Sequence, residues 1–264
     1  MKKISSINSR TIFALPYLIF MTMFVIVPLG LLFFRAFYEG GFSFDAVDKY
    51  FGAPGAWETI WRSLQIAFTA AALCILIGYP VAYIISRIES KTTQAILLML
   101  MIAPMWVNGL LRTIALRDLA GIIGIERGTF LLVIGLTIDF LPFMVMPIYL
   151  VLSGINKQYS EVSADLGATP IITFAKVTLP LSTPGIISGF LMVFTPAVST
   201  FYMSEWLHTG RGTVMIGEQL NLWLTKEEYS VAAVIALVLL ALVGLSVLLT
   251  HRLSKIGNTK GGLY

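Results

Sequence analysis

The segment EVSADLGATPIITFAKVTLPLSTPGI, Glu161–Ile186, carries two carboxylates, a lysine and three prolines between two long apolar stretches. The composition of the whole chain indicates its environment, because hydrophobic residues make up 57% of the 264 residues and charged residues only 12%. The mean hydropathy is +0.86, whereas a water-soluble domain would carry about 25% charged residues. We therefore expect the chain to lie in a lipid bilayer, with this half-polar segment at its surface.

Six apolar runs each reach the roughly 20 residues that a helix needs to cross the hydrocarbon core. Transmembrane β-strands alternate over much shorter segments, so these unbroken runs exclude a barrel. We predict an all-α, polytopic membrane protein with six transmembrane helices and a short surface helix in the loop Glu39–Trp61. The six runs are Thr11–Phe34, Ser63–Ser86, Thr92–Leu111, Thr129–Ser153, Val177–Ser204 and Tyr229–Thr250.

Six spans place both termini on the same side of the membrane. With the termini in the cytoplasm, ten of the 18 basic residues lie inside and eight outside, a weak bias of the kind that sets topology. We predict one transmembrane domain over residues 1–264, with a cytoplasmic loop at about 154–184. The inside set is Lys2, Lys3, Arg10, Arg87, Lys91, Lys157, Lys176, Arg252, Lys255 and Lys260, and the outside set is Arg35, Lys49, Arg62, Arg112, Arg117, Arg127, Arg211 and Lys226.

The opening segment predicts two short helices joined by a turn. Ser160 is placed to cap the first helix, and Gly167 suits the left-handed residue that ends such a helix. Thr169-Pro170 then begins a second helix, because proline fits the first helical position, and we expect Pro180 to end it. The result is a helix–turn–helix elbow at the inner membrane surface, suited to transmitting force from a cytoplasmic partner.

The order E-x-x-x-D-L-G-A, then a phenylalanine, then L-P-L-x-x-P-G-I resembles the EAA loop of ABC importer permeases. The two alanines that follow the glutamate in that family are Val162 and Ser163 here. The resemblance implies that this loop holds the coupling helix, which docks in a groove of the ATP-hydrolysing subunit. The coupling residues it implies are Glu161, Ala164, Asp165, Leu166, Gly167, Ala168 and Pro170.

Further segments look like the spermidine/putrescine-type permeases, in particular the subunit that pairs with a sister permease. They are LLMLMIAPMWVNGLLRTIAL (97–116), FLPFMVMPIYLVLSGINKQYSEVSADLGA (140–168), TPAVSTFYMSEWLHTG (195–210) and VMIGEQL (214–220). The resemblance implies a type I ABC importer permease (MetI-like) in the bacterial cytoplasmic membrane. It also implies three kinds of protein partner: a dimer of ABC ATPase subunits, a second homologous permease and an extracytoplasmic solute-binding protein.

No motif for chemistry lies in this chain. The G-x-x-x-x-G-K-[ST] phosphate loop and the H-E-x-x-H zinc motif are both missing from the sequence, and the lone Cys74 lies inside an apolar run. We therefore predict no enzyme activity, no catalytic residue, no metal site and no cofactor, and we assign ATP hydrolysis to partner subunits. The net charge of +4 is modest and predicts no nucleic-acid partner.

Asp139 is the one charged residue in the fourth apolar run. A charge near the bilayer midplane costs a few kcal/mol on insertion scales, so it normally faces a cavity or pairs with a partner. One interpretation is that its carboxylate receives an ammonium group of a passing polyamine. The alternative is a structural ion pair, or a hydrogen-bonded acid, inside the helix bundle.

Four more residues are candidates for the solute pathway. Glu205 stands beside Trp206 and after Tyr202, and a carboxylate flanked by aromatic faces suits a di- or triamine. The alternative is an interfacial acid in an aromatic belt. Trp106 and Asn108 lie in the outer half of the third run and are pathway candidates, and the alternative there is a plain interfacial tryptophan.

Three classes of protein compete on this sequence. A permease subunit of an ABC importer accounts for the elbow and for the missing nucleotide motif. A stand-alone, ion-driven transporter would show more intramembrane charges and paired inverted repeats, and a membrane enzyme would need a cluster of acids or histidines. The solute stays open at this point: a polyamine, another amine, an opine or a small organic ion.

Overall fold

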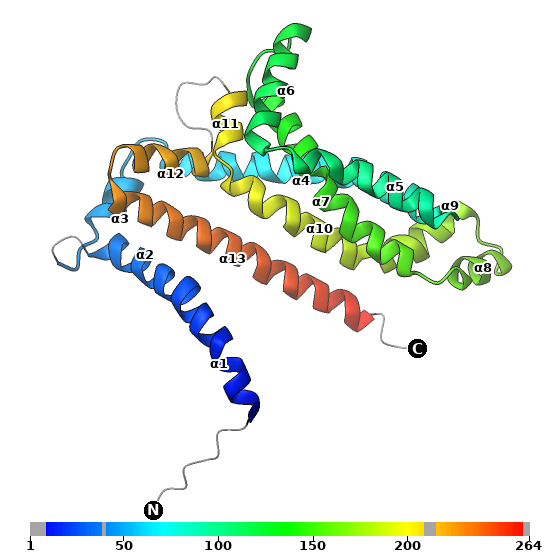
Figure 1. Cartoon of the computed structure of the whole chain (residues 1–264). Coiled ribbons are helices and arrows are strands. Elements are labelled where there is room, and N and C mark those ends of the chain that lie inside the picture. Colours follow the sequence, from blue (N-terminus) through cyan, green and yellow to red (C-terminus); the bar gives the residue numbers. More distant parts are fainter. Residues whose placement is uncertain (1–8, 39–40, 209–214, 261–264) are drawn as a thin grey trace, which may run out of the picture. The chain divides into compact units, whose positions relative to one another are not determined.

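In the computed structural model, the regular elements of the described residues, 9–38, 41–208 and 215–260, are all helices (Figure 1). Side chains are described between residues 15 and 248 within these ranges. The chain divides into two compact units, Met1–Ala56 with Leu222–Val238, and Trp57–Asn221 with Leu239–Tyr264. The helices are α1 (Ser9–Met21), η1 (Thr22–Ile26), α2 (Val27–Phe37), α3 (Asp45–Phe51), α4 (Ala56–Arg87), α5 (Lys91–Ile102), η2 (Ala103–Trp106), α6 (Gly109–Ile123), α7 (Thr129–Gly154), α8 (Gln158–Asp165), α9 (Pro170–Thr173), η3 (Phe174–Thr178), α10 (Leu179–Ser199), α11 (Tyr202–Leu207), α12 (Ile216–Thr225) and α13 (Tyr229–Lys260).

Five stretches of the described residues are apolar helices long enough to cross a membrane, and a further pair of helices is bent at a break. The prediction of an all-α polytopic protein is confirmed, and six spans are reached when the broken pair counts as one. That pair, Lys91–Trp106 and Gly109–Ile123, is bent by 91°. The five continuous stretches are Leu15–Phe37, Ala56–Arg87, Thr129–Gly154, Pro170–Ser199 and Tyr229–Leu248.

The predicted third span, Thr92–Leu111, is therefore wrong as a straight helix. Pro104 lies in the 3-10 turn η2, and the backbone at Val107 and Asn108 is extended before α6 begins. Proline supplies no backbone N–H to the helical ladder, so the run bends there although its side chains stay apolar. After this bend, α6 continues beyond the end of the predicted span, to Ile123.

Two further predictions of helix ends were wrong. Pro180 does not end a helix, because the π-turn η3 closes its last bond from the N–H of Leu179 to the carbonyl of Phe174. This wider turn shifts the hydrogen-bond ladder just before the residue that has no N–H, and α10 continues without a break. The fifth span ends at Ser199 rather than Ser204, so Glu205 lies on the separate helix α11.

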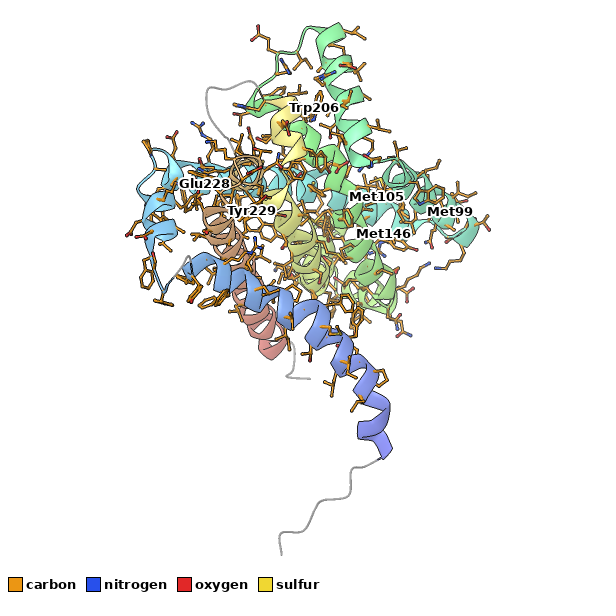
Figure 2. The ribbon with its side chains drawn as sticks, turned by 60° about the vertical axis from the view of Figure 1, so that its left-hand side comes forward. Met99, Met105, Met146, Trp206, Glu228 and Tyr229 are labelled. Carbon is orange, nitrogen blue, oxygen red and sulfur yellow. The ribbon has the colours of Figure 1, made fainter. Side chains whose placement is uncertain are left out.

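The smaller unit contains α1 to α3 and the chain from Leu222 to Val238. Helix α3 confirms the surface helix that was predicted between Glu39 and Trp61. Its Lys49 Nζ lies 2.5 Å from Oε1 of Glu228, which Figure 2 shows beside Tyr229 at the start of α13. The ring of Tyr50 is fully buried in this unit, and burial raises the pKa of its phenol to about 12.

The larger unit is built around α7, because glycines of two neighbouring helices lie directly against it. A Cβ on Gly189 of α10 would stand 2.7 Å from Met144 Sδ, and one on Gly185 would stand 2.9 Å from the carbonyl oxygen of Pro147. The G-x-x-x-G pattern of α10 thus serves packing inside the subunit. Figure 1 shows α8 and α9 at one end of this unit and α6 with α11 at the opposite end.

Candidate functional site

The first candidate site is the elbow, residues 158–178, which comprises α8, α9 and η3. Asn156 Oδ1 accepts a hydrogen bond from the N–H of Gln158 at 3.0 Å, so α8 begins before Ser160 and the predicted Ser160 cap is wrong. Gly167 has φ +81°, and its N–H donates to the carbonyl of Ala164 at 2.8 Å. The predicted glycine turn is confirmed, since a left-handed residue ends the helix here.

The second helix of the elbow begins as predicted. Thr169 has extended backbone, its hydroxyl accepts from the N–H of Ile172 at 3.4 Å, and Pro170 occupies the first helical turn. The two helices are tied together where Ser163 and Thr173, both buried, share a hydroxyl hydrogen bond of 2.8 Å. The Ser163 that replaces the family's alanine therefore braces the elbow from within.

The elbow is anchored to α4 through aromatic contacts. Phe174 lies edge-on to Tyr79 and Tyr83, with ring centroids 5.8 and 5.5 Å apart. Tyr79 is held further by a 2.9 Å hydrogen bond to Ser182 of α10. The elbow is thus in direct side-chain contact with α4, and Tyr79 links α4 to α10.

Three apolar side chains of the elbow are exposed at the surface of this subunit, and we call them together its exposed apolar face. Leu166 is 83% exposed, Ile171 79% and Val162 57%. Such a cluster at the end of a helical bundle is typical of a surface that a protein partner or a membrane covers. Of the other coupling residues, Glu161 and Asp165 are exposed, while Ala164, Ala168 and Pro170 line a cavity on the side of α4.

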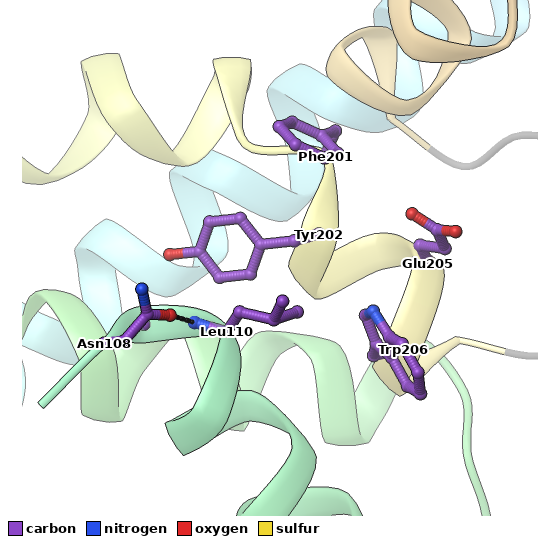
Figure 3. Close-up of a pocket in the computed structure, with 7 residues that line it drawn as sticks. Asn108, Leu110, Phe201, Tyr202, Glu205 and Trp206 are labelled. Atoms are coloured by element: carbon purple, nitrogen blue, oxygen red, sulfur yellow. Dashed lines mark hydrogen bonds between the residues drawn. The ribbon is translucent and has the colours of Figure 1, made fainter. Parts of the chain in front are cut away.

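The second candidate site is a pocket of about 400 Å³ at the end of the unit opposite the elbow. It is lined by Asn108, Gly109, Leu110, Phe201, Tyr202, Glu205 and Trp206. Figure 3 shows the Tyr202 ring extending toward Asn108, with Glu205 and Trp206 farther along α11. The structure thus brings together Asn108, Tyr202 and Glu205, three of the residues proposed from sequence.

The bend between α5 and α6 creates this pocket. Asn108 caps α6 through its side-chain oxygen, which accepts from the N–H of Leu110 at 2.9 Å. A Cβ on Gly109 would lie 2.8 Å from the hydroxyl oxygen of Tyr202, so glycine at this position leaves room for the end of that ring. Trp106 is 80% exposed on η2, and it is not among the residues that line the pocket.

Asp139 lies beside the pocket, 6% exposed, and forms an ion pair with Arg112 of α6. Its other oxygen accepts a hydrogen bond of 3.4 Å from the Tyr202 hydroxyl. Arg112 also donates from Nη1 to the carbonyl of Pro104 at 3.0 Å, so one guanidinium joins the bend, α6 and α7. The arrangement matches the structural ion pair, which was one of the two interpretations that the sequence allowed for Asp139.

For Arg112, at the outer end of the third run, the sequence favoured an interfacial anchor or a pair with an acid, but it did not identify Asp139 as that acid. Arg112 stands at the end of an apolar run, where a basic side chain is commonly an interfacial anchor. The available signal was one acid and one arginine within neighbouring apolar runs, since charges at that depth need a partner. The sequence did not show which two helices meet, so the pair had to come from the fold.

The family follows from a match over most of the chain. Residues 75–256 match the pattern of the "Binding-protein-dependent transport system inner membrane component" family. The chain belongs to this family. Its members are transport permeases, and the chain is a multi-pass membrane protein.

Named relatives cover most of this permease. It is 32% identical over 226 residues to the spermidine/putrescine transport system permease protein PotB of Escherichia coli K12, covering 78% of this chain and 81% of the relative. It is 30% identical over 221 residues to PotB of Haemophilus influenzae, covering 77% of each chain. To the permease protein PotC of the same system and organism it is 27% identical over 215 residues, covering 80% of this chain and 83% of the relative.

Solved structures share the fold. A chain of a bacterial ABC transporter involved in the import of alginate matches with a TM-score of 0.67 at 18% identity, covering 91% of this permease and 94% of that chain. A chain of the MetNI methionine ABC transporter in an inward-facing conformation matches with a TM-score of 0.61 at 19% identity, covering 76% and 94%. The expected type I importer permease fold is thereby confirmed.

Proposed function

We propose that this permease is a subunit of an ATP-driven importer and that, with a sister permease, it forms the pathway for polyamine uptake. The observation that carries the proposal is the placement of two sites in one unit. A braced elbow with an exposed apolar face lies at one end, and a pocket holding an exposed carboxylate among aromatic rings lies at the other.

Energy enters at the elbow in this proposal. A dimer of ABC ATPase subunits docks on the face of Val162, Leu166 and Ile171, all exposed here. Closure of the ATPases moves the elbow, and the contacts of Phe174 with α4 carry that movement into the spans. The cavity of the assembled importer then alternates between its two openings. Glu161, Ala164, Asp165, Gly167, Ala168 and Pro170 maintain the shape of this coupling loop.

The elbow therefore faces the cytoplasm of a bacterium, both termini lie on that side, and residues 1–264 form one transmembrane domain. An extracytoplasmic solute-binding protein delivers the solute at the opposite end, where α6 and α11 lie. The exposed face of α5 is available for lipid or the sister permease. Met99 on that face is 65% exposed and projects outward in Figure 2.

The charges around the pocket favour a cationic solute. Arg112 is paired with Asp139, and Arg117 is paired with Asp118 at 2.7 Å while it lies over the Trp206 ring. The Glu205 carboxylate has no ion pair with any described residue. The pocket is therefore anionic through Glu205, and its volume falls within the range of small-molecule sites.

A polyamine matches this arrangement because it is a chain of ammonium groups separated by apolar methylenes. One ammonium pairs with Glu205, the methylenes lie along Tyr202 and Phe201, and a second ammonium reaches the side-chain oxygen of Asn108. Trp106 lies just outside the pocket, where it contacts solute entering from the surface. Asp139 acts in this proposal by neutralising Arg112, which would otherwise repel a cation.

The experiment is uptake of labelled spermidine and putrescine in cells with and without this permease, its partners present and ATP depletable. We expect ATP-dependent uptake to need the chain and to fall in Glu205→Gln. The matched control is Asp48→Asn, which removes an exposed carboxylate of α3 far from the pocket in sequence. Uptake that is unchanged without the chain would refute the polyamine assignment. ATP-dependent uptake of another small organic solute in the same cells would retain the permease role and replace the substrate.

A further inference from the structure

A second cavity lies between the elbow and the end of α4. It has a volume of about 340 Å³, and we call it the elbow cavity. Its walls come from the last turns of α4, one side of α8, and the segment from Ala168 to Thr178. The lining residues are Tyr83, Arg87, Ser160, Ala164, Ala168, Pro170, Thr173, Phe174 and Thr178.

The lining of the elbow cavity is basic and rich in hydroxyl groups. Arg87 supplies a guanidinium, and Ser160, Thr173 and Thr178 supply hydroxyls, while none of the described residues that line it is acidic. The guanidinium of Arg87 lies over the Tyr83 ring, 5.1 Å from its centroid, which limits its rotation. No described Asp or Glu forms an ion pair with Arg87. A guanidinium that has no ion pair with these residues, next to the hydroxyl groups of Ser160 and Thr178, is suited to bind a phosphate.

The elbow cavity and the exposed apolar face are on different sides of α8. Ser160 and Ala164 are four residues apart and line the cavity, whereas Val162 and Leu166 follow each of them by two positions. Residues two apart on an α-helix point about 200° from each other. A ligand in the cavity would therefore leave the face proposed for the ATPase uncovered.

The position of Arg87 indicates where that ligand comes from. Arg87 is the last residue of the apolar helix Ala56–Arg87, so it lies at the depth of the lipid head groups. Basic pockets between transmembrane helices at the cytoplasmic surface are suited to anionic lipid head groups. Free phosphate would share the chemistry, but the membrane supplies head groups at this depth continuously.

We propose that the elbow cavity binds the phosphate of an anionic phospholipid of the cytoplasmic leaflet. The phosphate accepts hydrogen bonds from the Arg87 guanidinium and the neighbouring hydroxyls, and it joins the end of α4 to α8. The elbow then moves with α4 as one body, so bound lipid raises the share of ATP turnovers that transport solute. The cytoplasmic location rests on the proposed function, whereas lipid binding can be measured without any transport.

The binding test uses the complete importer purified in a mild detergent. Native mass spectrometry counts phosphatidylglycerol molecules retained by the wild type and by Arg87→Gln. We expect the variant to bind that lipid roughly tenfold more weakly at this site, because a hydrogen bond to a charged group is lost. Lys176→Gln is the matched control, since it removes a basic residue of the same elbow that does not line the cavity.

A second measurement compares ATP-coupled uptake in nanodiscs of phosphatidylcholine alone and of phosphatidylcholine with phosphatidylglycerol. We expect the anionic lipid to stimulate the wild type and Lys176→Gln but not Arg87→Gln, with Arg87→Lys intermediate. Equal lipid retention by wild type and Arg87→Gln would overturn the proposal. Displacement of the lipid by millimolar inorganic phosphate would also overturn it, by showing a site for free anions. If the wild-type importer retains the lipid but takes up no polyamine, that result would contradict only the proposed solute.

Discussion

Replacing Asp139 by Asn tests whether this buried acid is a counter-ion or a solute ligand. The substitution keeps the shape of the side chain but leaves the Arg112 guanidinium without its ion pair. Breaking a buried pair from one side costs about 3–5 kcal/mol in soluble proteins. Polar contacts in membranes are usually worth less, and the Arg112 side chain is 24% exposed, so we expect a loss of about 2 kcal/mol.

Transport by the Asp139→Asn variant should also fall, for a reason separate from its loss of stability. The unpaired guanidinium would place a positive charge next to the pocket that receives the cation. For a dication at roughly 10 Å and an effective dielectric of about 40, the repulsion is about 1.7 kcal/mol, which predicts a rise in KM of roughly 15- to 20-fold. The double variant Asp139→Asn with Arg112→Gln removes both charges. It should recover most of the KM and at least about 1 kcal/mol of the stability.

The assay combines a double-mutant cycle on thermal unfolding of the purified importer with uptake kinetics of labelled putrescine. Arg112→Gln alone is informative, because it leaves the negative charge of Asp139 and should not raise KM for a dication. If the double variant transports as poorly as Asp139→Asn, the counter-ion argument is refuted, and Asp139 would be a direct ligand of the solute.

Proline cannot adopt the φ of +81° that Gly167 has, so Gly167→Pro should abolish ATP-coupled uptake, while immunoblots still find the chain in the membrane. Normal uptake by this variant would contradict the role of the elbow. Gly189→Ala brings a methyl group within 2.7 Å of Met144 Sδ, and we expect thermal unfolding to show a loss of about 1–3 kcal/mol, whereas Gly244→Ala, with no atom within 4 Å, should be neutral. Burial lowers the pKa of His208 below its usual 6.5, so the fold favours the neutral ring and should lose stability as pH falls from 6.5 through the lowered pKa. His208→Gln should flatten the pH dependence of thermal unfolding in this window. If the variant loses stability at low pH as the wild type does, a group other than His208 is responsible for that loss.

The elbow and the spans could be predicted because their signals are local. A glycine turn and a Thr-Pro helix start depend on residues within four positions, and hydropathy over roughly 20 residues identifies a span. The Ser160 cap failed for an equally local reason. The Asn156 side-chain oxygen accepts from the N–H of Gln158, and α8 begins at that residue, two positions before Ser160.

The sequence alone determined the solvent of this protein, its helical class and the resemblance of its elbow to a coupling loop, since composition and short-range order carry these. The tertiary structure decided the site. The apolar run across Pro104 gives no sign of a 91° bend, and nothing local indicates that Arg112 meets Asp139 or that Glu205 leaves the span for a helix of its own. These features depend on which helices pack together, and packing between distant segments is an energy of the whole fold that no short stretch of residues contains.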